Sequence, residues 1–266
     1  MMHHRPEIML LLFAFLFGTI AGSFCGLVSD RYRPWMSFRR QCRIICSPYS
    51  ECAVCHHRLR WFELLPVISF LVLRSRCRYC RHPLPPRLLL FEAGGGIAGI
   101  IAGLALPDIL PWFATVIFSA LLSILADIDR RYLLLPDSLV FTVLCSGLLF
   151  AACFPALSLD ARIAGICAGY SSLLIINYLY RYWRNTEGIG GGDMKLLAAL
   201  GAWCGWQALA GIIVVATLLA LSTLCCQGRL RVSLQKNTPL PLGFYLAIAG
   251  WGWFIVSAAF NYSPVL

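Results

Sequence analysis

The sequence predicts an all-α polytopic membrane protein with about eight transmembrane helices, on the evidence of its composition, its apolar segments and the placement of its basic residues. Hydrophobic residues make up 59% of the 266 residues and charged residues only 13%, against about 45–50% and 25% in soluble domains. A chain this apolar is neither a soluble globular enzyme nor an intrinsically disordered protein. We therefore expect most of it to lie in a bilayer.

Eight segments are candidate membrane spans, because a membrane helix needs about 20 predominantly apolar residues. They are residues 8–28, 88–106, 109–126, 138–154, 163–180, 196–206, 208–226 and 242–260. The sixth is short and could be a half-span or the start of a broken helix. The first could be a cleaved signal peptide, but the segment after it is much more basic than the one before it, which favours an uncleaved span.

The basic residues indicate which loops face the cytoplasm. Loop 30–87 contains twelve arginines, so we expect it to be cytoplasmic. Alternation of the spans then places loops 127–137, 181–195 and 227–241 on the same side, and all 22 basic residues except Arg5 and Arg162 lie in these four loops. The net charge of +10 is thus explained by membrane orientation and predicts no nucleic-acid partner.

Four of the 13 cysteines form two Cys-x-x-Cys pairs in loop 30–87, Cys52 with Cys55 and Cys77 with Cys80. Two such pairs at this separation can place four thiolates tetrahedrally around Zn²⁺. Four protein ligands leave no position for water, so the expected zinc is structural. The alternatives are two unrelated pairs or a redox dithiol, although a redox pair usually lies in a βαβ context.

We expect three regions: residues 1–29 as the first transmembrane helix, 30–87 as the cytoplasmic zinc-binding loop, and 88–266 as the main membrane domain. Three histidines near the cysteines, at positions 56, 57 and 82, are alternative ligands but are more often solvated in a basic loop. Segment 61–73 is apolar but too short to span, so we expect it at the membrane surface.

Two clusters of acidic residues fall at predicted helix ends on the cytoplasmic side, where buried charges are costly and often functional. The first contains Asp127 and Asp129, and the second, residues 187–195, contains Asp193. Within the second cluster Gly190, Gly191 and Gly192 would let the backbone adopt positive φ and approach a substrate. Their N–H and C=O groups could also hydrogen-bond an extended peptide.

Two carboxyl groups at hydrogen-bonding separation share one proton, because both cannot easily ionise. One can then activate water as a general base while the other protonates a carbonyl oxygen and later the leaving amine. This chemistry is peptide hydrolysis at a membrane surface. The alternative is that these residues are ordinary interfacial charges paired with Arg130, Arg131 or Lys195.

Residues 129–137 (Asp-Arg-Arg-Tyr-Leu-Leu-Leu-Pro-Asp) and 187–197 (Glu-Gly-Ile-Gly-Gly-Gly-Asp-Met-Lys-Leu-Leu) resemble the two signature motifs of the bacterial type IV prepilin peptidases. These enzymes are prepilin leader peptidases/N-methyltransferases, and the second motif is the GxGD motif of membrane aspartic proteases. Segments 22–24, 82–86 and 201–206, the paired cysteines and Glu92 are also similar to this family.

The resemblance implies that Asp129 and Asp193 are catalytic, since the family's first aspartate lies seven residues before the proline at position 136. Asp137 would instead cap the helix that follows. The implied substrates are prepilins of a type IV pilus or pseudopilins of a type II secretion system. Each has a short basic leader in the cytosol followed by a hydrophobic membrane helix. The implied location is the bacterial cytoplasmic (inner) membrane, and recognition would use the substrate helix and an acidic residue near its start.

Many members of this family also methylate the new N-terminus with S-adenosylmethionine. Those members typically have an asparagine after the acidic residue of the loop and a lysine before the third cysteine. This sequence has Leu64 after Glu63, and Arg76 before Cys77. Because a leucine cannot hydrogen-bond a cofactor or an amine, the sequence leaves methylation open.

Two other functions are consistent with parts of the sequence. A non-enzymatic membrane scaffold or transporter would explain the spans and the cysteines, but transport predicts buried charges near the bilayer midplane. A GxGD protease that cuts within a substrate's span is disfavoured by the zinc loop and by the interfacial carboxylates. The sequence does not predict an oligomeric state.

Overall fold

The computed structural model describes residues 5–46, 49–52, 54–64, 66–106, 108–154, 158–186, 188–227 and 240–262. The chain forms two compact units, Met1–Pro107 and Asp108–Leu266. The predicted regions 1–29, 30–87 and 88–266 were defined by membrane placement and stay a prediction. Four charged residues of the predicted cytoplasmic loops lie outside the described residues: Glu187, Arg229, Arg231 and Lys236.

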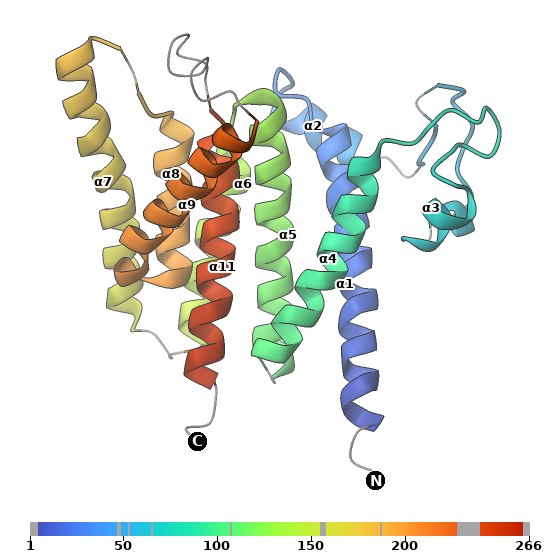
Figure 1. Ribbon diagram of the computed structural model, residues 1–266, viewed down its shortest axis with the longest axis horizontal. Coiled ribbons are helices and arrows are strands. Elements are labelled where there is room, and N and C mark those ends of the chain that lie inside the picture. Colours follow the sequence, from blue (N-terminus) through green and yellow to red (C-terminus); the bar gives the residue numbers. More distant parts are fainter. Residues whose placement is uncertain are drawn as a thin grey trace. The chain divides into compact units, whose positions relative to one another are not determined.

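Each of the eight predicted spans corresponds to a helix (Figure 1). The helices are α1 (Arg5–Arg31), α4 (Pro86–Ala105), α5 (Ile109–Tyr132), α6 (Asp137–Cys153), α7 (Leu159–Arg184), α8 (Gly191–Cys204), α9 (Trp206–Cys226) and α11 (Leu242–Tyr262). Within the described ranges six of them are long and apolar enough to cross a membrane. The chain is therefore a multi-pass membrane protein. The other two, α6 with 17 residues and α8 with 14, are shorter.

The first unit contains a helical hairpin of α1 and α4, which lie side by side along an interface of small residues. A Cβ atom at Gly95 would collide with the carbonyl oxygen of Gly18 and lie 3.0 Å from the Cα of Gly22. Gly99 faces the backbone of Ala14 in the same way. Membrane helices associate through such close backbone approach, because lipid supplies no hydrophobic drive for helices to pair.

The loop between α1 and α4 contains three short helices, α2 (Phe38–Ile45), η1 (Trp61–Leu64) and α3 (Ile68–Val72). The Arg31 guanidinium, at the end of α1, donates to the carbonyl oxygens of Ile45 at 2.9 Å and Tyr49 at 2.8 Å. It thereby satisfies a carbonyl that the end of α2 leaves without a helical partner. The start of the loop is thus fastened to the first membrane helix.

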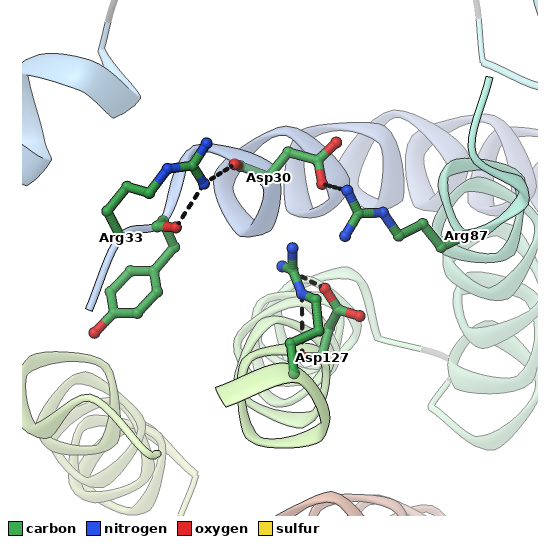
Figure 2. Close-up of polar contacts among 6 residues, drawn as sticks. Asp30, Arg33, Arg87 and Asp127 are labelled. Atoms are coloured by element: carbon green, nitrogen blue, oxygen red, sulfur yellow. Dashed lines mark hydrogen bonds and ion pairs between the residues drawn. The ribbon is translucent and has the colours of Figure 1, made fainter. Parts of the chain in front are cut away.

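Two carboxylates strengthen the hairpin, and one of them also binds the loop. Asp30 at the end of α1 forms an ion pair with Arg87 at the start of α4 (Figure 2). Glu92 of α4 accepts a hydrogen bond from the Ser23 hydroxyl at 2.9 Å and another from the backbone N–H of Val67 at 2.7 Å. Val67 has a φ of 61°, which is costly for a β-branched residue. The Glu92 carboxylate therefore helps to hold a strained turn against the hairpin.

The second unit is built around α8, which packs against α6, α7, α9 and α11. Trp203 near its end is 1% exposed, stacks on Phe118 with ring centroids 4.1 Å apart, and donates its indole N–H to the Val143 carbonyl at 2.9 Å. The buried Arg162 guanidinium lies 3.4 Å from the carbonyl oxygens of Ala202 and Trp203. A cation at the carboxyl end of a helix interacts favourably with its dipole. These contacts fix the position of α8.

The α1–α4 interface can be tested with two adjacent glycines. Alanine favours a helix over glycine by about 1 kcal/mol, and a Cβ at Gly94 meets nothing within 4 Å. We therefore expect Gly94→Ala to keep or raise the thermal midpoint of the protein in detergent, and Gly95→Ala to lower it by pushing α1 away. Equal midpoints for the two variants would contradict the close helix approach.

Candidate active site

The first carboxylate cluster lies on a helix and not in the loop that was expected after residue 126. Helix α5 continues to Tyr132, so Asp127 and Asp129 project about 200° apart around its axis. Asp129 faces inward and is 4% exposed. Asp127 is paired with Arg131 at 2.6 Å (Figure 2). The helix geometry thus separates a buried carboxyl group from one already paired with a cation.

A tight turn, residues 133–136, follows α5. Leu133 adopts a left-handed conformation with φ 52°, and Pro136 precedes the first residue of α6. The expectation that Asp137 caps α6 is wrong. Pro136 occupies the cap position without a side-chain bond, and Asp137 pairs with Lys195 at 2.7 Å. Proline with its fixed φ suits a helix start, which leaves the aspartate available for the lysine.

The second carboxylate cluster forms the start of α8, as the sequence predicted. Gly190 precedes the helix with φ −67° and ψ 141°, and its carbonyl accepts the Asp193 N–H at 3.1 Å. The expected positive φ at residues 190–192 is not found. Among the described glycines only Gly205 has a positive φ. Gly192 is small for another reason: a Cβ there would lie 2.9 Å from the Cβ of Leu135. A Cβ at Gly191 would meet nothing within 4 Å.

The two carboxyl groups meet at the amino-terminal turn of α11. The Phe244 N–H donates to Oδ2 of Asp129 at 2.9 Å. The Gly243 backbone amide interacts with the carboxyl groups of both Asp129 and Asp193. The first N–H groups of a helix have no partner within it, so they are available to two acids. Asp129 and Asp193 are thereby brought together from α5 and α8.

Asp193 lies at the start of α8, before the apolar part of that helix, and holds its proton more tightly than an ordinary aspartate. Burial raises the pKa of Asp193 to about 7, and the charge of nearby Asp129 adds to the rise. Among the described residues neither Asp129 nor Asp193 forms an ion pair with a lysine or arginine. The alternative that these two acids are ordinary paired interfacial charges is therefore not supported. At neutral pH the two groups can share one proton.

Sequence reasoning did not include α11 in this site. The signal available was a Pro-Leu-Gly sequence at positions 241–243, directly before an apolar span. Proline and glycine at this place mark a helix start, but a helix start alone does not indicate which side chains it faces. That information depends on the tertiary packing of α11 against α5 and α8.

The four predicted cysteine ligands also come together, in the loop of the first unit. Their sulfur atoms all lie within 4.8 Å of one another, with Cys52 to Cys80 at 3.7 Å and Cys55 to Cys77 at 3.9 Å. Ligands about 2.3 Å from a tetrahedral zinc ion would be about 3.8 Å apart. The cluster could therefore hold such an ion with small movements of the side chains at most. The neighbouring histidines are not part of it.

The two cysteine pairs have the same local structure. The first cysteine of each pair donates its N–H to the carbonyl five residues later, Cys52 to His57 at 3.0 Å and Cys77 to His82 at 2.9 Å. The residue before that carbonyl has positive φ in both cases, 53° at His56 and 57° at Arg81. Backbone N–H groups of Cys55 and Val54 lower the pKa of Cys52 to about 6, which favours the metal-binding thiolate.

Comparison with known proteins gives matches along nearly the whole chain. The profile of the bacterial peptidase A24 N-terminal domain matches residues 16–106, and that of the type IV leader peptidase family matches residues 116–225. A prepilin leader peptidase/N-methyltransferase of Dickeya chrysanthemi is 36% identical over 258 residues, which cover 90% of each chain. One of Burkholderia pseudomallei is 37% identical over 265 residues, 92% of this chain and 85% of its own. No solved structure matches significantly.

The raised pKa of Asp193 predicts a pH-dependent stability. Its value in the folded protein, about 7, exceeds that of an unfolded aspartate, about 3.9. Ionisation of Asp193 therefore reduces stability progressively as the pH rises from about 4 to 7. We expect Asp193→Asn to raise the thermal midpoint more at pH 8 than at pH 5. Asp127→Asn removes the partner of Arg131, so we expect it to raise the thermal midpoint at neither pH. An equal gain from Asp193→Asn at both pH values would contradict the shift.

Proposed function

We propose that this chain, which belongs to the type IV leader peptidase family, is an aspartic endopeptidase of the bacterial inner membrane that removes the basic leader from prepilins or pseudopilins. The observation that carries the proposal is the meeting of Asp129 and Asp193 at the start of α11. These two acids come from the two segments that resemble the signature motifs. A substrate of this kind is also implied by the names of the relatives.

The surroundings of the two acids assign them different roles. The Phe244 N–H stabilises negative charge on Asp129, and burial raises the pKa of Asp193 to about 7, so we assign the shared proton to Asp193. Asp129 then takes a proton from water as the water oxygen attacks the scissile carbonyl carbon, and Asp193 protonates the carbonyl oxygen. As the C–N bond breaks, Asp129 gives its proton to the leaving amine and Asp193 recovers one from the diol. Both acids return to their starting states.

The site suits a substrate whose scissile bond lies at the membrane boundary. Asp129 is at the carboxyl end of one helix and Asp193 at the amino end of another, so both lie at helix ends and not at mid-span. Gly191, beside Asp193, faces open space, where an extended peptide can approach the backbone. We propose that the residues 190–192 contact the substrate on this side.

A scaffold or transporter is not favoured. In the described part of the chain the buried Asp129 and the half-buried Asp193 lack cationic partners, and a purely structural role gives no reason to keep such groups unpaired. The family match points the same way.

Replacing either acid tests the peptidase. We expect Asp129→Asn and Asp193→Asn each to abolish removal of the leader from a co-expressed type IV prepilin, because each variant removes one proton-transfer group. Mass spectrometry of the pilin N-terminus would report the cleavage. Asp127→Asn is the matched control two residues away, and it should retain most of the activity because Asp127 is paired with Arg131.

Normal processing by both the Asp129 and Asp193 variants would refute the proposed function. Loss of processing in the Asp127 variant alone would move the catalytic role to that residue. Membrane insertion should be checked for every variant, so that loss of protein is not read as loss of activity.

We also propose that the cysteine cluster of Cys52, Cys55, Cys77 and Cys80 holds structural Zn²⁺. The sulfur separations and the repeated backbone turn support a preformed tetrahedral site. With four thiolate ligands the ion has no open position for a substrate or water. Its role would be to fold the loop, and hydrolysis would be left to the two acids.

Metal analysis tests the zinc site. We expect one zinc ion per chain in the wild-type protein, and loss of that zinc in Cys52→Ser and Cys77→Ser, measured by elemental mass spectrometry on detergent-purified protein. The control is Cys42→Ser, an exposed cysteine of the same loop that lies outside the cluster. Full zinc content in Cys52→Ser would show that the four thiolates do not form the site.

The residues fit the methyl-transfer cofactor S-adenosylmethionine only partly. Glu63 is 7% exposed, and its Oε1 is the one carboxylate oxygen among the described residues that is buried without a partner. Its neighbour Leu64 is 45% exposed and offers no hydrogen bond. We therefore propose no methyl-transfer step, and the N-terminal masses of the processing experiment report directly whether a methyl group is added.

A further inference from the structure

The amino-terminal turn of α11 has a second feature besides its hydrogen bonds to the acids, namely a glycine packed against one of them. A Cβ at Gly243 would lie 3.0 Å from Oδ2 of Asp129, 3.1 Å from its Cγ and 2.8 Å from Cδ1 of Leu135. The approach to Leu135 is closer than real Cβ atoms show, although the end of that side chain can move, and the approaches to Asp129 are tighter than most real Cβ contacts. A side chain here would therefore have to shift the Asp129 carboxyl group or the α11 backbone by a few tenths of an ångström. Gly243 is buried.

Leu135 closes this arrangement from the other side. It is 8% exposed, and its side chain is the nearest neighbour of the two glycines that stand beside the acids, Gly192 and Gly243. The turn after α5 is thus wedged between the starts of α8 and α11. The backbone of α11 cannot retreat from Asp129 without losing this packing.

We propose that Gly243 and Phe244 are positioning residues for the peptidase reaction: the first turn of α11 holds the Asp129 carboxylate in place with its N–H groups, and glycine at 243 allows the backbone to come close enough. The inference rests on the proposed function, because it assigns a role relative to the catalytic acids. The carboxylate would be preorganised as a base by backbone donors that cannot rotate away.

The nearby charged side chains have other partners or are exposed, so stabilisation of the Asp129 carboxylate depends on the backbone. Arg131 of α5 is paired with Asp127, and Lys195 of α8 with Asp137. Arg130 of α5 is exposed. The titratable group of α11 nearest to this turn, Tyr245, forms a hydrogen bond of 2.6 Å with Thr223. Among the described residues no lysine or arginine therefore pairs with Asp129, and the N–H groups of α11 are its polar contacts.

Three glycines of α11 give a matched test with purified protein and a prepilin substrate. We expect Gly243→Ala to lower kcat roughly ten- to hundredfold, the effect of disturbing hydrogen bonds to a charged group, and to move the acid limb of the pH–rate profile to higher pH. In Gly250→Ala the three atoms nearest to the new methyl group belong to the Leu200 side chain, and in Gly252→Ala it meets nothing within 4 Å. We expect neither variant to move the acid limb of the pH–rate profile. A lower folded fraction of Gly250→Ala would reduce the rate without moving this limb.

A pair of substitutions at the next residue isolates one hydrogen bond. Phe244→Pro removes the N–H that binds Asp129, and proline is tolerated in the first turn of a helix. Phe244→Ala removes the same ring but keeps the N–H. We expect the proline variant to share the displaced acid limb of Gly243→Ala, and the alanine variant to keep the wild-type limb. This comparison remains informative if Gly243→Ala does not fold.

The outcomes separate the two proposals. If the wild-type enzyme is active and both aspartate variants are dead, but Gly243→Ala and Phe244→Pro keep the wild-type pH profile, then the positioning role is refuted and the peptidase stands. If the aspartate variants are active, the proposed function itself fails.

Discussion

The close approach of two carboxyl groups at the ends of separate helices is the constraint on which the second unit depends. Two like charges so near one another cannot both form without a large free-energy cost. Three features together reduce this cost: a proton kept on Asp193, backbone N–H donors aimed at Asp129, and the exclusion of bulky side chains by Gly243. The remaining helices of this unit hold the three helix ends at one place.

Much of this arrangement could be predicted from the sequence. The eight apolar segments and the four cysteines are properties of local composition and spacing, and the structure has helices and a cysteine cluster where they were expected. The two acids were also identified by their spacing, but Asp129 lies on α5 and not in the expected loop. Helix ends were predicted less well. The apolar stretch stops at Ala126, but α5 continues through Asp127 and Asp129, where the start of α11 binds the Asp129 carboxylate. Tertiary contacts extended the helix beyond its apolar pattern.

The parts that could not be predicted depend on which surfaces pack together. The separation of Asp127 from Asp129 required knowing that both lie on one helix. The small size of Gly192 is explained by the Leu135 side chain that packs against it, and not by the positive φ that glycine usually indicates. Likewise, nothing local to residues 241–244 indicates that they bind an aspartate more than a hundred positions earlier.

The short length of α6 and α8 has a consequence for the surrounding lipid. Helices of 17 and 14 residues reach about 26 and 21 Å, less than the roughly 30 Å of a hydrocarbon core. Helix α8 is enclosed by other helices, whereas α6 exposes Phe141 and Leu149, so the surface around α6 matches a locally thinner bilayer. Such hydrophobic mismatch links the acyl-chain length of the lipids to the depth of the two acids in the membrane. The thickness of the membrane thereby helps to determine which part of a substrate chain reaches the acids.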